Sequence, residues 1–171
     1  MSTMNAFLAG AAPLLLAACA QIPAAVPAPL VPPGEVPLTH VAARGVQVYE
    51  CRNAPTAAPA WTFVAPEADL IDARGMVIGR HGAGPYWQML DGSRIVGSVK
   101  ARADAPRAGA IPWLLLGTRN DGRPGRWSQV TSVQRLNTAG GVAPASGCDD
   151  ASIGRTARVP YTAEYVLFVP R

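Results

Sequence analysis

Short hydrophobic runs separated by turn-forming residues constrain the fold of this chain more than any other feature. From residue 45 onward, apolar or alternating runs lie between clusters of Gly, Pro, Asp and Asn. No part of this region keeps, for any length, the 3.6-residue hydrophobic spacing of an amphipathic helix. The pattern is typical of strands joined by tight turns, so we expect an all-β fold.

The runs themselves locate the strands. Residues 45–51 alternate between two faces, as do residues 161–169, whose tyrosines 161 and 165 share one face. Further runs span 61–65, 68–72, 76–80, 86–90, 94–101, 111–118 and 127–136. About eight or nine strands in one domain predict a single-domain antiparallel β-sandwich or small β-barrel, and the pattern does not distinguish the two.

The N-terminus predicts export and a lipid anchor. The apolar run 6–18 is too short to span a bilayer and ends in Leu16-Ala17-Ala18-Cys19, which resembles the cleavage site of bacterial lipoproteins. We therefore expect a signal peptide over 1–18 and a lipid on Cys19 that anchors the protein to the membrane. Residues 1–5 hold no Lys or Arg, which departs from the usual signal. The alternatives are an ordinary cleaved secretory peptide and a buried apolar segment. Ala20 after the cysteine favours an outer-membrane lipoprotein facing the periplasm, or a protein on the cell surface.

Residues 19–37 predict a tether between this anchor and the folded domain. The segment from Ala20 is mostly Ala, Pro and Val with almost no charge, a composition that favours extended polyproline conformations. The remaining residues 38–171 have the size of one domain. We therefore expect a single all-β domain there.

The cysteine count supports export. Once Cys19 carries the lipid, Cys51 and Cys148 remain as an even pair in an oxidising compartment, and we expect them to form a disulfide. Two free buried thiols or two metal ligands are the alternatives. With only His40 and His81 beside them the spacing matches no zinc site, so no metal and no cofactor is predicted. The glycines around position 82 do not follow the dinucleotide-binding spacing either.

The net charge of +4 does not predict nucleic-acid binding. All fifteen basic residues except Lys100 are arginines, and they are spread along the chain rather than clustered. Scattered charge is typical of a solvated surface, so we expect no nucleic-acid partner.

The segment 81–97 is the best candidate for a site because it combines an imidazole, aromatic side chains and two tight turns. His81, Asp91 and Arg135 are the candidate acid, base or anion-binding residues. Each has a structural alternative: Asp91 forms the turn with Gly92, and His81 binds backbone from a loop. Trp87, Tyr86 and His81 are the candidate binding residues, and Trp87, next to the Gly84-Pro85 bend, is the tryptophan expected at the surface.

Ordered matches along the domain resemble the family catalogued as domain of unknown function 3455. They are Gly45-Val46-Gln47-Val48-Tyr49-Glu50-Cys51, Trp61-Thr62-Phe63, Gly79-Arg80-His81, Gly84-Pro85-Tyr86-Trp87, Asp91-Gly92-Ser93, Ile111-Pro112-Trp113-Leu114-Leu115-Leu116, Val130 to Thr138 and Val159-Pro160-Tyr161-Thr162-Ala163. The resemblance implies a secreted protein without an assigned activity.

Two classes of function follow. The first is a noncatalytic binding module of the cell envelope that recognises a small ligand, a glycan or a protein through the 81–91 region. The second is an envelope enzyme in which His81 is the general base, assisted by Asp91 and Arg135. The sequence favours the first because it contains no Gly-x-Ser-x-Gly or His-Glu-x-x-His motif. Convergence of His81, Trp87, Asp91 and Arg135 in one pocket would support an enzyme or a small-ligand site.

Overall fold

The computed structural model describes residues 24–55 and 57–171. It is all-β, and these residues contain no α-helix, only the short 3-10 helices η1 (Ala28–Leu30) and η2 (Asp150–Ser152). The strands are β1 (Glu35–Ala54), β2 (Ala57–Ile71), β3 (Val77–Gly82), β4 (Tyr86–Met89), β5 (Arg94–Ala103), β6 (Trp113–Asn120), β7 (Ser132–Gly140) and β8 (Thr156–Pro170). The predicted fold class is therefore confirmed.

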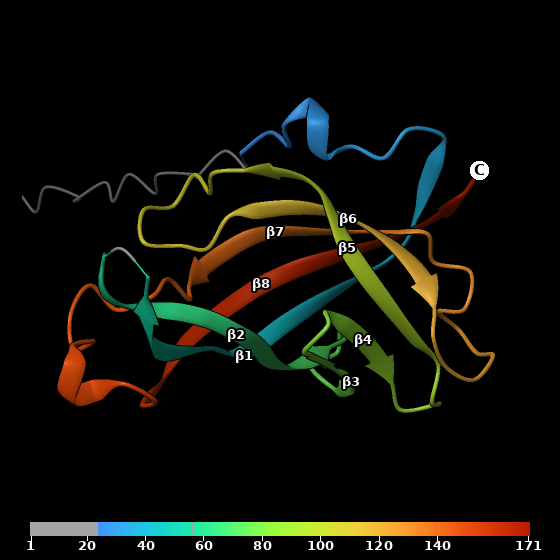
Figure 1. Ribbon diagram of the computed structural model, residues 1–171. Coiled ribbons are helices and arrows are strands. Elements are labelled where there is room, and N and C mark those ends of the chain that lie inside the picture. Colours follow the sequence, from blue (N-terminus) through green and yellow to red (C-terminus); the bar gives the residue numbers. More distant parts are fainter. Residues whose placement is uncertain (1–23, 56) are drawn as a thin grey trace, which may run out of the picture.

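The eight strands form one antiparallel sheet that closes on itself (Figure 1). Each strand pairs with the next, and β8 pairs with β1 from Glu50↔Thr156 to Glu35↔Pro170. Of the two predicted architectures, the structure has the closed ring of a barrel and not two stacked sheets. Each described strand has a partner on both sides, although β2 pairs with β3 only over residues 68–71 and β5 pairs with β4 only over residues 94–96.

Two details differ from the predicted strands. Residues 61–65 and 68–72 belong to one strand, β2, because pairing with the long β1 continues through Pro66. The predicted strand 127–136 begins only at Ser132, since Trp127 and Ser128 lie in turns closed by backbone hydrogen bonds. Buried Trp127 fills the core from this turn instead of from a strand.

The two strongest turn signals are confirmed. Gly75 and Gly92 have φ of 81° and 87°, a region that favours glycine. The Asp72 carboxylate accepts hydrogen bonds from the backbone N–H groups of Arg74 and Met76, both at 2.9 Å. These turns set the register of β2 against β3 and of β4 against β5.

Hydrophobic side chains pack on both faces of part of the ring. The main core fills the interior and includes Trp87, Ile95 and Leu167. A second cluster lies on the outer face of β6, β7 and β8, where Leu30 of η1 covers Trp113 and Phe168 (Figure 1). This second layer explains why residues 111–118 are hydrophobic on both sides.

The fold starts inside the segment predicted as a tether. Leu30 is 0% exposed and β1 begins at Glu35, whereas the domain was expected from residue 38. Residues from Leu30 onward thus belong to the domain, because an apolar side chain covers the outer cluster. Residues 1–23, including the predicted signal peptide and Cys19, lie outside the described residues.

The disulfide expected from the cysteine count is present. Cys51 at the end of β1 is bonded to Cys148, and their Cα atoms are 5.3 Å apart. The bond ties β1 to the connection between β7 and β8. Within the part of the chain that is described, no helix has the length and hydrophobicity to cross a membrane.

Candidate functional site

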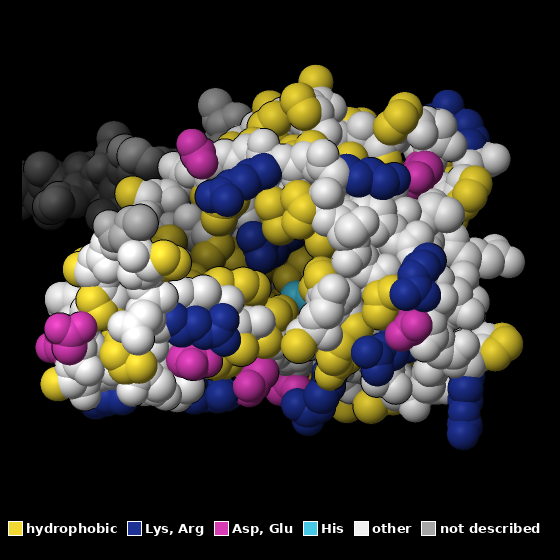
Figure 2. All heavy atoms as spheres, viewed as in Figure 1, with side chains coloured by type: hydrophobic (Ala, Val, Ile, Leu, Met, Phe, Trp, Pro, Cys, Tyr) yellow, Lys and Arg dark blue, Asp and Glu magenta, His cyan; other side chains and the backbone are white. Residues whose placement is uncertain are grey.

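A cavity of about 590 Å³ opens into the interior of the ring. All eight strands contribute to its lining, and Figure 2 shows the opening as a hollow with hydrophobic side chains around it and a histidine surface inside. The lining residues are Gln47, Tyr49, Phe63, Val64, Pro66, His81, Gly84, Pro85, Trp87, Val99, Arg102, Ile111, Pro112, Leu114, Leu116, Arg135 and Tyr165. A pocket of this size fits the range typical of small-molecule sites.

His81 and Trp87 face each other across β3 and β4 on one wall of the cavity. They are partners in the strand register, and their rings stack with centroids 4.6 Å apart and planes at 18°. The Tyr165 ring from β8 meets the His81 ring edge-on, with centroids 5.1 Å apart. His81 was expected in a loop, but it lies within β3 and is only 4% exposed.

The protonation of His81 follows from its contacts. Nδ1 lies 2.7 Å from the backbone oxygen of Tyr86, and because a carbonyl only accepts, Nδ1 carries the hydrogen and donates it. The pKa of His81 is lowered from 6.5 to about 3, mainly by burial and to a smaller extent by the charge of Arg135, while the hydrogen bond to Tyr86 opposes the shift. The imidazole is therefore neutral near pH 7, with its Nε2 lone pair free of that hydrogen bond.

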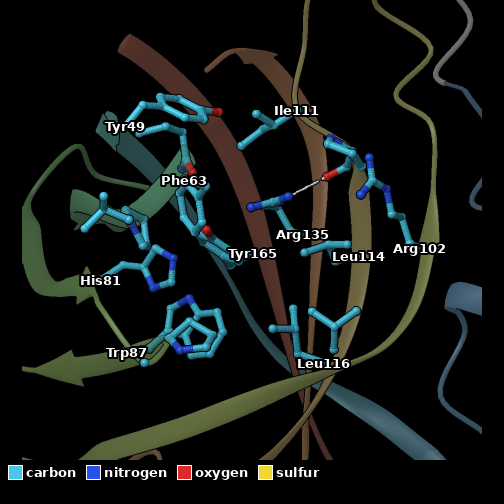
Figure 3. A pocket seen from close by; sticks show the side chains of 17 residues that line it. Tyr49, Phe63, His81, Trp87, Arg102, Ile111, Leu114, Leu116, Arg135 and Tyr165 are labelled. Atoms are coloured by element: carbon cyan, nitrogen blue, oxygen red, sulfur yellow. Dashed lines mark hydrogen bonds between the residues drawn. The ribbon is translucent and has the colours of Figure 1, made fainter. Parts of the chain in front are cut away.

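Arg135 places a cation inside the cavity. Its Nε and Nη2 atoms donate hydrogen bonds of 3.1 and 2.9 Å to the backbone oxygen of Pro112 (Figure 3). Among residues 24–55 and 57–171 no ion pair includes Arg135, and the Tyr165 hydroxyl lies near its guanidinium. A half-buried guanidinium without an ion-pair partner among these residues keeps its full charge directed at the cavity.

Three buried polar groups in the lining form no hydrogen bond of standard geometry with the described residues: the Tyr165 hydroxyl, Trp87 Nε1 and Gln47 Nε2. The Tyr165 hydroxyl still lies near Tyr161 and Arg135, and Gln47 lies near Tyr161. Burial raises the pKa of Tyr165, so its hydroxyl keeps its proton at neutral pH. All three groups can donate a hydrogen bond, and burying such a group unpaired is unfavourable.

Asp91 does not join this site. Its side chain accepts hydrogen bonds from Ser93 N at 2.8 Å and Ser93 Oγ at 2.6 Å in the β4–β5 turn, and from Arg126 N at 3.2 Å in the β6–β7 connection. The Ser93 side-chain hydrogen bond is the largest cause that lowers the pKa of Asp91. The structure thus brings His81, Trp87 and Arg135 together and leaves Asp91 to its turn.

The two aromatic candidates also differ from expectation. Trp87 was expected at the surface but is 1% exposed, because its inward position on β4 packs it against the core. The Tyr86 side chain points to the other face of β4, where the Arg94 guanidinium lies 4.3 Å from its ring centre. Only the backbone oxygen of Tyr86 serves this cavity, through His81.

Sequence reasoning did not select most of the lining. Tyr49, Phe63, Leu114, Leu116 and Tyr165 line the cavity, and none was a candidate site residue. The strand alternation was the available signal, since it placed Gln47 and Tyr49 on one face of β1 and Tyr165 on a shared face of β8. Which of these faces is the interior depends on ring closure.

The site combines an apolar cavity with a cation and hydrogen-bond donors. No group of three or more His, Cys, Asp or Glu side chains in the described ranges could hold a metal ion. The chemistry available here is recognition of a molecule with an apolar body and acceptor atoms.

Comparison with known proteins gives a single match. No curated protein and no solved structure matches the chain. Residues 32–169, well over half of the sequence, match the model of one family, as the sequence motifs predicted. The chain therefore belongs to the family described as protein of unknown function (DUF3455).

Proposed function

We propose that this chain is an exported lipoprotein domain that binds a small molecule, without catalysis, inside its ring of strands. The observation that carries the proposal is the cavity of about 590 Å³, with its aromatic wall and its arginine. The Arg135 guanidinium supports a ligand there, since it lines the cavity and forms no ion pair among the described residues. Among the ligand classes considered, a small molecule fits better than a glycan or protein, because Trp87 is buried and offers no exposed stacking surface.

The alternative function, an enzyme with His81 as general base, has less support. An imidazole with a pKa of about 3 is a weak base near neutral pH. Asp91, its expected carboxylate partner, is bound within its own turn. Nδ1 of His81 instead donates to the backbone oxygen of Tyr86, and this hydrogen bond raises the pKa of His81 by less than burial lowers it.

The place of action is proposed from the N-terminal sequence. Leu16-Ala17-Ala18-Cys19 would deliver the protein to the outer membrane with its domain in the periplasm or at the cell surface. The disulfide supports an oxidising compartment.

A pocket-filling variant tests the binding function. Leu114 lines the cavity, so Leu114→Trp places an indole in the space a ligand would occupy. We expect the neutral probe 1-naphthylacetamide to bind the purified full chain at one saturable site, measured by ligand-observed NMR at up to millimolar concentration. Leu114→Trp should weaken this binding about tenfold or more, while melting at nearly the same temperature.

Leu90→Trp is the matched control, because Leu90 is an exposed turn residue outside the cavity lining. This variant should bind the probe as the wild type does. Equal binding by wild type and Leu114→Trp, or no saturable binding at all, would overturn the proposed function.

A further inference from the structure

We propose that the ligand of this cavity is an amphipathic organic carboxylate whose anionic group binds Arg135. The inference rests on the proposed function and names the chemical class of its ligand. It follows from the charges, the hydrogen-bond donors and the apolar surface of the lining.

The charged side chains that line the cavity are all positive. Arg102, Leu114, Arg135 and Tyr165 are successive register partners on β5, β6, β7 and β8, so two arginines lie in one row across the sheet. Both arginines line the cavity, and its lining contains no Asp or Glu. Since neither arginine forms an ion pair within the described residues, an anion would meet an uncompensated positive field.

The free edge of Arg135 suits a carboxylate. The edge formed by Nε and Nη2 is used on the Pro112 oxygen. A guanidinium has five N–H groups, so the end formed by Nη1 and the second hydrogen of Nη2 stays available. Two parallel N–H groups at this end match the two oxygens of a carboxylate.

Neighbouring donors favour the same ligand chemistry. Figure 3 shows the Tyr165 hydroxyl and the Arg135 guanidinium on the same side of the cavity. This hydroxyl forms no hydrogen bond of standard geometry within the described residues, and it lies near Arg135 and Tyr161. A group that only accepts hydrogen bonds, such as a carboxylate, can satisfy donors of this kind.

The rest of the cavity suits an apolar body. Tyr49 and Phe63 meet edge-to-face with centroids 5.8 Å apart, and Leu114 and Leu116 lie on the wall that carries Arg135. Phe63 is half exposed, so an apolar surface continues from the interior to the mouth. A ligand with an aromatic or aliphatic body and one acid group fits this distribution.

A matched pair of compounds tests the inference. The acid 1-naphthylacetate and the neutral 1-naphthylacetamide have nearly the same shape, and only the acid carries a charge. We expect the full chain to bind the acid about tenfold or more tightly than the amide at pH 7, the gain typical of a charged hydrogen bond. Arg135→Gln should reduce this preference to nearly equal binding of the acid and the amide.

Two further variants keep the test sharp. Arg119→Gln removes the same charge from an exposed side chain paired with Asp121 and should keep the preference. Arg135→Lys keeps the charge but cannot form two parallel hydrogen bonds to a carboxylate, so its preference for the acid should be reduced. This measurement tests the inference even if Arg135→Gln does not fold.

Equal binding of acid and amide by the wild type would overturn the carboxylate assignment and leave the proposed function standing. An equal loss of preference in Arg119→Gln would also overturn it, because general surface charge would then be the cause. Failure of both compounds to bind would count against the proposed function itself.

Discussion

The surroundings of His81 and Trp87 give them other roles than general base and exposed binding surface, the roles that the sequence suggests. Imidazole is the usual base near neutral pH, but burial in the interior keeps this one uncharged. Tryptophan beside a Gly-Pro bend suggests an exposed binding surface, but alternation along β4 turns Trp87 inward. Both residues therefore contribute to folding as well as to the shape of the cavity.

The buried imidazole makes stability depend on pH. The folded protein holds His81 at a pKa of about 3, against 6.5 ordinarily, so between these values the unfolded chain binds more protons. Its contribution is complete above about pH 6.5 and is lost as the pH falls toward about 3. Relative to pH 7.5, this group alone should cost about 2 kcal/mol of unfolding free energy at pH 5.

Urea unfolding of wild type and His81→Asn at the two pH values measures this effect. Asparagine does not titrate. Between pH 7.5 and pH 5 the unfolding free energy of His81→Asn should therefore fall by about 2 kcal/mol less than that of the wild type. All other titrating groups are common to both proteins and cancel in the comparison. The same pH dependence in both would show that His81 is not the group responsible.

Trp87→Ala should destabilise the domain strongly. Removing a fully buried aromatic side chain from a packed core costs about 3 to 5 kcal/mol. Trp61→Ala is the matched control: Trp61 is only partly buried and its indole nitrogen donates to the Ser146 oxygen at 2.9 Å. In thermal melts, Trp87→Ala should unfold at a clearly lower temperature than Trp61→Ala. Equal melting of the two variants would contradict the burial of Trp87.

At the scale of elements, β1 connects most of the molecule. It pairs with β2 on one side and β8 on the other, and Cys51 lies near its C-terminal end. The disulfide partner, Cys148, is 97 residues away in the connection that leads to β8. The bond therefore joins β1 to the segment that leads into β8, near the Glu50↔Thr156 end of the pairing that closes the ring.

Breaking this bond should lower stability without removing the fold. Constraining a loop of this length in the unfolded chain contributes about 4 to 5 kcal/mol at most. We expect the double variant Cys51→Ala/Cys148→Ala to unfold at a lower urea concentration than the oxidised wild type. Reductant should shift the wild type toward the variant and leave the variant unchanged. Two thiols that react with an alkylating reagent in the non-reduced exported protein would contradict the bond.

For the whole molecule, the ring and the N-terminal segment together suggest a cavity held close to a membrane. The described chain enters through η1, which packs on the outer cluster, and continues directly into β1. A lipid on Cys19 would place the domain near the bilayer, because few residues separate Cys19 from Leu30. An amphipathic ligand released from or delivered to a membrane suits that position.

Lipidation of Cys19 is tested by membrane partition. Expressed as the full chain in a bacterium, the wild type should enter the detergent phase on phase separation. Cys19→Ala cannot accept a diacylglycerol and should be depleted from the lipid-labelled fraction when cells are fed a labelled fatty acid. Ala18→Ser, a small-for-small change in the same motif, should retain the label. Equal labelling of wild type and Cys19→Ala would refute the anchor.

The sequence by itself determined the features that depend on near neighbours in the chain. Alternation of side chains predicted strands, Asp72 to Gly75 and Asp91-Gly92 predicted turns, and an even cysteine pair predicted the disulfide. Each of these signals is local, or is limited to a single possible pair, so no three-dimensional information was needed. The family was also predicted from motifs in the sequence, without any structure.

Tertiary structure decided which face of each strand is inside and which distant residues meet. Alternation has a period of two, and it is equally strong whichever face turns inward, so it did not place Tyr49 and Tyr165 in the cavity. Pairing of β8 with β1 closed the ring and made these faces the interior. Ring closure places Arg135 in the same cavity as His81 and Trp87. Asp91 does not line this cavity, because its carboxylate accepts hydrogen bonds from Ser93 in the adjacent turn. The cavity thus depends on long-range pairing, which no short stretch of sequence encodes.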